Sequence, residues 1–264
     1  DALVGDLLAK LKASGKYDDT LIVYMGDHGA DLIRGKRTCY EGGVRVPLIV
    51  RLPKGKAGQE RRELVSSLDL FPTFLEMSGA EPVPDLPGSS LLPLLRGEKP
   101  KWRQYMPTEF HLHSAHNYYP QRAIRNDRYK LIENLQPGEV DPGYEFTVNR
   151  FFGQQVLAAL PKAPKKVQVA YALMKRPPKY QLYDLQMDPY EFVNLAKDPA
   201  HRSAFDELST ELTRWRRATH DPLLNQDNVS RLKAEIDAIR QGNDFNKAKI
   251  GQWKYPEYFF KKGN

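Results

Sequence analysis

Apolar residues follow two different spacings in the first part of the chain. The leucines that begin it recur at helical intervals: Leu3, Leu7, Leu8 and Leu11. This spacing predicts a helix, and Gly15 predicts its end. Two unbroken apolar runs follow, TLIVYM at residues 20–25 and VPLIVRLP at residues 46–53. Their length and β-branched content predict strands, and we expect the first to be a buried parallel strand.

Helical spacing returns at residues 64–80. Pro72 lies near the start of this predicted helix, where proline is tolerated, and Gly79 lies at its end. Its large apolar residues form one face: Leu68, Phe71, Phe74 or Leu75, and Met77. Residues 81–102 are rich in proline and glycine, so we expect irregular structure with a short helical piece, and residues 103–110 predict a strand.

The pattern changes near residue 120. Residues 121–134 predict a hairpin that turns at Asn126 and Asp127, and YQLYDL at residues 180–185 predicts another short strand. The chain between them is rich in proline, lysine and aromatic residues, and we expect one helix in it, at residues 150–160.

The most regular helix pattern covers residues 198–221, where Asp198 is the predicted N-cap and Pro199 takes the first helical position. Its predicted buried stripe is formed by large apolar residues: Phe205, Leu208, Leu212 and Trp215. A polar helix is predicted at residues 228–240. The tail at residues 243–264 alternates lysines with aromatic residues, which could bind a membrane or a polyanion. We favour a terminal arm that packs its aromatic side chains on the domain or on a partner subunit.

Composition limits the class of protein. The chain has 264 residues, of which 41% are hydrophobic and 28% charged, as in globular proteins of one or two domains. No long apolar run occurs, so we expect no membrane partner. Cys39 is the only cysteine, which excludes an internal disulfide and a cysteine-rich metal site. The net charge of +7 suits either an anionic partner or a merely soluble surface, and without a zinc-finger or RNP-like motif we expect no nucleic acid partner.

Candidate chemistry is concentrated between the two apolar strands, in MGDHGADLIRGKRTCYEGGVRVP. Asp27 and His28 directly follow the first strand, and ligands of α/β sheets bind at the carboxyl ends of strands. A carboxylate and a neutral imidazole can bind a divalent cation, but Ca²⁺ needs about six to eight donors, so other ligands must come from elsewhere. Lys36 could hold a phosphate or sulfate oxygen, and we expect Arg45 to pair with Glu41. On spacing alone, a simple turn and a solvated lysine are the more common interpretations.

The whole stretch resembles the sulfatase family of the alkaline-phosphatase-like superfamily. Its strand ends in Gly-Asp-His-Gly and is followed by Gly-Lys-x-Thr-x-Tyr-Glu-Gly-Gly-x-Arg-x-Pro, as in the family signature. The segments SSLDLFPTFLEMSG, GSSLLPLLRG and YQLYDLQMDPYEFVNLA match further family segments. The resemblance runs from residue 1 to about residue 222. The long insertion and LTRWRRATHDPLL look most like heparan N-sulfatase (sulfamidase)-like bacterial sulfatases.

This resemblance implies the fold. We expect an α/β chain that forms the C-terminal part of an alkaline-phosphatase-like mixed sheet flanked by helices. A smaller α+β subdomain, with a short antiparallel sheet and a long helix, would complete it. The expected division gives residues 1–120 to the α/β catalytic domain and residues 121–264 to the subdomain. Because a central strand at residues 20–25 is normally preceded by further βα units, we also expect this chain to be the C-terminal portion of a longer protein.

The resemblance also implies roles for single residues. Asp27 and His28 match the last two calcium ligands of sulfatases, and Lys36 matches the lysine that contacts the sulfate oxygens and stabilises charge during the reaction. His111 and His113 fall in the loop that borders the substrate pocket in sulfamidase-like enzymes. His116 is expected to lie outside that pocket.

The family nucleophile is a formylglycine made from a cysteine or serine in a Cys/Ser-x-Pro/Ala-x-Arg motif. The chain contains no such motif, so we expect the formylglycine in a missing N-terminal portion. Cys39 is followed by Tyr-Glu-Gly-Gly-Val instead, and we expect it to be a buried small side chain rather than a nucleophile.

The implied function is hydrolysis of a sulfate ester or N-sulfate on a saccharide or aryl substrate, with calcium as cofactor. This chain would be inactive without the N-terminal portion of the same protein, and it could form a homo-oligomer. Sulfamidases have asparagine where His28 stands, so O-sulfate hydrolysis is open as well. One alternative is a phosphonate or phosphodiester hydrolase of the same superfamily, which His28 favours. Another is a non-catalytic glycan-binding protein. The resemblance leads us to expect a periplasmic or secreted location.

Overall fold

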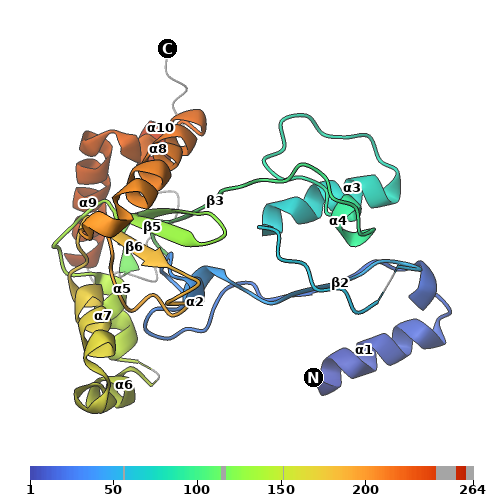
Figure 1. Ribbon diagram of the computed structural model, residues 1–264, viewed down its shortest axis with the longest axis horizontal. Helices are drawn as coiled ribbons and strands as arrows, with labels where there is room; N and C mark the ends of the chain where they lie inside the picture. The colour runs from blue at the N-terminus through green and yellow to red at the C-terminus, as the bar shows by residue number, and fades with distance from the viewer. Residues whose placement is uncertain (56, 114–116, 151, 242–253, 260–264) are drawn as a thin grey trace. The chain divides into compact units, whose positions relative to one another are not determined.

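The computed structural model describes the chain in five stretches: residues 1–55, 57–113, 117–150, 152–241 and 254–259. Its backbone divides into two compact units. The first contains Asp1–Asp27 and Val46–Met106, and the second contains His28–Arg45 and Pro107–Asn264. Figure 1 traces both. The expected domain division at residue 120 stays a prediction.

The first unit begins with helix α1 (Ala2–Ala13), which ends before Gly15 as predicted. Strand β1 (Ile22–Met25) pairs antiparallel with strand β2 (Leu48–Arg51). The prediction of a buried parallel strand was therefore wrong. A parallel partner would have to come from a separate βα unit, whereas β2 returns directly beside β1 after the intervening loop. No residue of β1 is buried, and Tyr24 is exposed.

Helix α3 (Leu70–Ser78) is shorter than the helix predicted for residues 64–80. A 3₁₀ turn precedes it, where Ser66 and Asp69 cap each other's backbone amides. The helix turns Thr73 inward, and the amide of Leu91, just before α4 (Leu92–Leu95), donates to the Thr73 hydroxyl. The predicted apolar face is exposed in this structure: Leu68, Phe71, Phe74 and Met77.

The second unit is built on a four-stranded sheet in the order β3–β4–β5–β6. Its strands are β3 (Met106–Phe110), β4 (Gln121–Arg125), β5 (Tyr129–Asn134) and β6 (Tyr180–Asp184). Strands β4 and β5 form the predicted antiparallel hairpin, and β5 pairs antiparallel with β6. The Asn126 side chain closes the hairpin turn by accepting hydrogen bonds from the Arg128 and Tyr129 amides.

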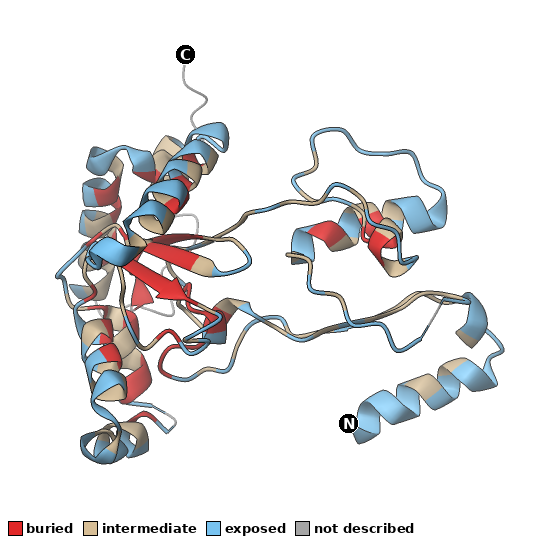
Figure 2. Ribbon diagram, in the orientation of Figure 1, coloured by how far each residue is buried: buried red, intermediate tan, exposed pale blue. Residues whose placement is uncertain are grey.

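Helices cover both faces of this sheet (Figure 1). Helix α8 (Arg202–Ala218) packs on β4 and β5 through Leu208 and Leu212, which belong to its predicted stripe. Helices α5 (Pro142–Val148), α6 (Gly153–Ala159) and α7 (Lys165–Lys175) contribute to the core on the other face. Figure 2 shows the buried residues gathered on the strands between these layers. The sequence predicted only α6 among these three helices, because the proline and lysine content around α5 and α7 hides their short periodic pattern.

The C-terminal part adds α9 (Gln226–Gln241) and α10 (Tyr255–Phe259). Tyr255 and Phe259 pack against a core cluster that contains Leu232 and Ile236 of α9. This packing agrees with the prediction of an arm whose aromatic side chains cover the domain, while residues 242–253 and 260–264 lie outside the described residues. Among the described residues, no helix combines the length and apolarity that a membrane crossing needs.

Candidate functional site

The loop after β1 folds back on itself through close backbone contacts within the second unit. The Gly29 amide donates to the carbonyl oxygen of Gly43 at 2.9 Å, and the Lys36 amide donates to the carbonyl oxygen of Ala30 at 2.9 Å. A methyl group on Gly29 would overlap the carbonyl oxygen of Gly42. Only glycine therefore permits the approach that gives this loop its shape.

Arg37 fixes the middle of the loop next to Lys36. Its backbone is in the left-handed region (φ 75°), which is strained for any residue but glycine. Its guanidinium pairs with the Asp31 carboxylate and lies over the Phe146 ring of α5, 4.8 Å from the ring centroid. The side chain of Arg37 is only 6% exposed. These contacts compensate the strain and hold Lys36 beside them.

Buried charges anchor the end of the loop to β5. The Glu41 carboxylate accepts hydrogen bonds from Lys130 Nζ at 3.0 Å and from Arg125 Nη1 at 2.7 Å. The Glu191 carboxylate accepts from the Glu41 amide at 2.7 Å and lies 3.4 Å from Lys130 Nζ. Burial opposes ionisation of Glu41, but Lys130 and Arg125 outweigh it and lower the pKa of Glu41. The prediction that Arg45 pairs with Glu41 was wrong, because Arg125 and Lys130 from the hairpin take that place.

Sequence reasoning missed the role of Lys130 and Glu191. Lys130 is 1% exposed although it lies in a strand, where a lysine normally faces solvent. Burial raises the pKa of Glu191, which Lys130 partly offsets. Arg34 of the loop donates to the Glu191 carbonyl oxygen at 2.6 Å. The sequence signal for Glu191 is its place in DPYEFVNLA, a segment that resembles the family.

Asp27 and His28 offer donor atoms for part of a cation site, and both are exposed. His28 Nδ1 donates to the Gly29 carbonyl oxygen at 2.8 Å, so a neutral imidazole carries its lone pair on Nε2, as a metal ligand requires. A carboxylate such as that of Asp27 is the oxygen donor that Ca²⁺ prefers. Within the described stretches, no three His, Cys, Asp or Glu side chains come close enough to hold a metal. Each of the two side chains thus offers a donor atom of a kind that divalent cations bind.

His113 lies within electrostatic reach of the loop. Burial is the largest cause that lowers its pKa, and the positive charges of Lys36 and Arg37 lower it further. Its backbone amide donates to the Asn117 side-chain oxygen at 2.9 Å. Lys36, His28 and His113 thus share one region of the second unit. His116 lies outside the described residues.

His111 belongs to a different environment. Its Nδ1 lies 3.2 Å from Arg122 Nη1, and since a guanidinium can only donate, Nδ1 accepts and Nε2 carries the proton. Burial, followed by the charge of Arg122, lowers the pKa of His111 to about 4. Arg122 is fully buried and forms two hydrogen bonds with Asp221, at 2.9 and 2.8 Å. The His111 ring also meets the Phe259 ring of α10 edge to face, with the ring centroids 6.2 Å apart.

Cys39 is fully buried, as expected. Burial raises the pKa of its thiol to about 11, so the thiolate is not formed near neutral pH. Its amide donates to the side-chain oxygen of Gln121 at 3.0 Å, which ties the loop to β4.

Residues 26–145, which contain Asp27, His28, Lys36, His111 and His113, match the family described as N-sulphoglucosamine sulphohydrolase, C-terminal. An ulvan-active sulfatase of Formosa agariphila is 32% identical over 212 residues, which cover 78% of this chain and 39% of that protein. Human N-sulphoglucosamine sulphohydrolase is 31% identical over 243 residues, which cover 84% of this chain and 46% of that protein.

The chain belongs to the sulfatase family. It matches the C-terminal region of that family and spans less than half the length of these relatives. A solved structure of a 2-O GAG sulfatase superposes with a TM-score of 0.63 at 25% identity, over 83% of this chain and 40% of that one. The expected alkaline-phosphatase-like α/β fold class is thereby confirmed.

Proposed function

We propose that this sulfatase chain is part of an enzyme that hydrolyses sulfate groups on sulfated saccharides. The observation that carries the proposal is the Lys36 loop, whose shape is set by Gly29. The Arg37–Asp31 ion pair fixes its middle, and the Lys130–Glu41 ion pair fixes its end. The printed names of the ulvan-active and N-sulphoglucosamine relatives support a sulfated saccharide as the substrate class. Sulfate esters and N-sulfates remain equal candidates, and an aryl sulfate is a further possible substrate.

In this proposal the Lys36 ammonium holds a sulfate oxygen and stabilises the negative charge that develops on it. Partial burial and the positive charges of Lys36 and Arg37 lower the pKa of His113, which favours a neutral ring that can donate a hydrogen bond to a saccharide hydroxyl or accept one from it. His111 is held with Nε2 as a donor by Arg122, and it would contact the saccharide rather than the sulfate held by Lys36.

Asp27 and His28 would hold a calcium ion together with ligands that this chain does not supply. When bound, the ion would supply positive charge that polarises the sulfate. The nucleophile, a formylglycine, is proposed to come from an N-terminal portion of the same protein. That portion would be this chain's partner, and the chain by itself would be inactive.

The competing function within the superfamily is hydrolysis of a phosphonate or phosphate diester, which the imidazole of His28 favours. The full-length protein should be assayed with N-sulfated glucosamine, glucosamine 6-sulfate, an aryl sulfate and a phosphonate monoester, in the presence of Ca²⁺ and of EDTA. Faster turnover of one of the sulfates and its loss in EDTA would support the proposal. Faster turnover of the phosphonate would move the function to phosphoester chemistry. Saccharide binding without any turnover would support the glycan-binding alternative.

A further inference from the structure

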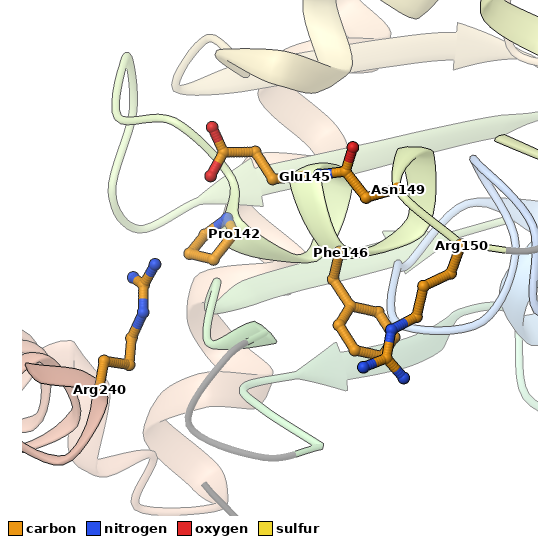
Figure 3. Close-up of a pocket in the computed structure, with 6 residues that line it drawn as sticks. All are labelled: Pro142, Glu145, Phe146, Asn149, Arg150 and Arg240. Carbon is orange, nitrogen blue, oxygen red and sulfur yellow. The ribbon is translucent and has the colours of Figure 1, made fainter. Parts of the chain in front are cut away.

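A hollow of about 290 Å³ lies on the second unit, on the side of α5 (Figure 3). Six residues line it: Pro142, Glu145, Phe146, Asn149, Arg150 and Arg240. Its volume is just below the roughly 300–1,000 Å³ that is typical of small-molecule sites. The hollow contains none of the residues assigned to the sulfate or to the metal, so it has no role in the proposed chemistry.

Arg150 is oriented for an anion. Its guanidinium lies over the Phe146 ring, 4.2 Å from the ring centroid, as Figure 3 shows. Stacking uses the flat face of a guanidinium and leaves its N–H edge for in-plane hydrogen bonds to a carboxylate or sulfate. Among the described residues, the Arg150 side chain forms no ion pair or hydrogen bond.

The remaining side chains of the hollow are those that a sugar would need. Arg240 comes from α9, and its nearest carboxylate oxygen, on Asp237, is 3.8 Å away, too far for a hydrogen bond. Glu145 and Asn149 offer oxygen and amide groups of the kind that bind sugar hydroxyls. Glu145 would repel inorganic sulfate but can accept a hydrogen bond from a sugar hydroxyl. These side chains therefore suit an anionic group carried on a hydroxylated ring better than they suit inorganic sulfate.

The Phe146 ring connects the hollow to the Lys36 loop. Arg37, the neighbour of Lys36 in the chain, and Arg150 both lie over this ring, at 4.8 and 4.2 Å from its centroid. Arg37 is buried and paired with Asp31, whereas Arg150 is exposed, so Arg150 is the arginine at this ring that an anion can reach. Because the loop that carries Lys36 contacts this ring through Arg37, an oligosaccharide whose sulfate is held by Lys36 would extend its next residue toward the hollow.

We propose that this hollow is a second saccharide subsite, which binds a sulfated or uronic acid residue adjoining the one whose sulfate is removed. The inference rests on the proposed function, since it assumes that the ligand is an anionic saccharide of more than one residue. Arg150 and Arg240 bind the anionic group, and Glu145 and Asn149 bind hydroxyls. The subsite thus selects polymeric over monomeric substrates.

The test compares two ligands in the full-length protein that contains this chain. Binding of a heparin-derived tetrasaccharide and of glucosamine 6-sulfate is measured by calorimetry for Arg150→Gln, Arg240→Gln and Lys36→Ala. The matched control is Arg202→Gln, because Arg202 also lies over a phenylalanine but does not line the hollow. Arg150→Gln and Arg240→Gln should each weaken binding of the tetrasaccharide about tenfold, as expected for loss of one charge-assisted hydrogen bond. Their Kd for the monosaccharide should stay within about twofold of the wild-type value.

The inference is overturned if both hollow variants bind the tetrasaccharide as tightly as Arg202→Gln does, or if they weaken monosaccharide binding as much as tetrasaccharide binding. It is also overturned if the wild type does not bind the tetrasaccharide. Failure of the proposed function has a different signature. In that case Lys36→Ala would bind both ligands normally, while the Arg150→Gln effect on the tetrasaccharide would stand and the subsite would be supported.

Discussion

The buried ion pairs around Lys130 make a quantitative prediction for the substitution Lys130→Met. Methionine is similar in length to lysine and suits a buried position, so the substitution removes mainly the charge. Glu41 would keep its hydrogen bond from Arg125 at 2.7 Å. Glu191 would keep the hydrogen bond from the Glu41 amide but would lose its nearest cation, at 3.4 Å.

The cost follows from that one uncompensated carboxylate. Breaking a buried ion pair by removing one partner typically costs about 3–5 kcal/mol of unfolding free energy. Because burial already raises the pKa of Glu191, a proton can neutralise it in the variant. The penalty should therefore be smaller at pH 5 than at pH 8, since protonation is easier at the lower pH. The double variant Lys130→Met/Glu191→Gln, which has no charge left unpaired, should recover about half of the loss.

The assay is urea unfolding of the full-length protein followed by circular dichroism at pH 5 and pH 8. A matched control is Lys197→Met, because Lys197 is an exposed lysine of the same unit. The reasoning is refuted if Lys130→Met unfolds at the same urea concentration as Lys197→Met, or if the double variant is less stable than the single one.

Four further substitutions test other parts of the account by the same urea method. Gly29→Ala should lower the unfolding free energy by at least about 2 kcal/mol and weaken binding of a sulfated saccharide, because the new methyl group would overlap a backbone oxygen. Gly5→Ala is the matched control: its methyl group meets only open space in α1, so it should raise the unfolding free energy by about 0.5–1 kcal/mol. Burial raises the pKa of Asp141 from 3.8 to about 7, so the folded state binds the proton more tightly than the unfolded state. The unfolding free energy should therefore fall as the pH rises from about 4 to about 7, by about 4 kcal/mol at most. Asp141→Asn keeps an oxygen acceptor for the cap of α5 and should abolish this decline, and an unchanged pH profile would contradict the assignment. Leu208→Ala should cost about 2–5 kcal/mol, because Leu208 is fully buried where α8 packs on the sheet, and a cost below 1 kcal/mol would argue against that packing.

The sequence predicted those elements whose signals are local. The hairpin at residues 121–134 depends on turn residues that act over a few positions, and the structure has it. Asp198 caps a chain segment as predicted, but that segment is the 3₁₀ turn Pro199–His201, and the long helix α8 begins after it at Arg202. The direction of β1 could not be predicted in this way. An apolar run indicates burial, but the pairing of a strand depends on which other strand lies beside it.

The same distinction applies to the candidate site. Asp27, His28 and Lys36 could be selected because they are close in sequence and follow a strand. The loop that carries Lys36 is anchored through Glu41 by Lys130 and Glu191, which are far apart in the chain and meet only after folding. A buried lysine in a strand gives no local signal, because the carboxylates that stabilise it come from elsewhere. The roles of Asp27, His28, Lys36, His111 and His113 therefore stay predictions that only ligand binding and catalysis can test.

The central claim is that Lys36 holds the sulfate of the substrate. The measurement that tests it most directly is the rate of sulfate release from a sulfated saccharide by the full-length protein, compared between Lys36→Ala and Lys197→Ala. We predict that Lys36→Ala lowers kcat/KM about 100-fold or more, as expected for loss of a charge that stabilises the transition state, and that Lys197→Ala has wild-type activity. Equal activity of the two variants would contradict the account.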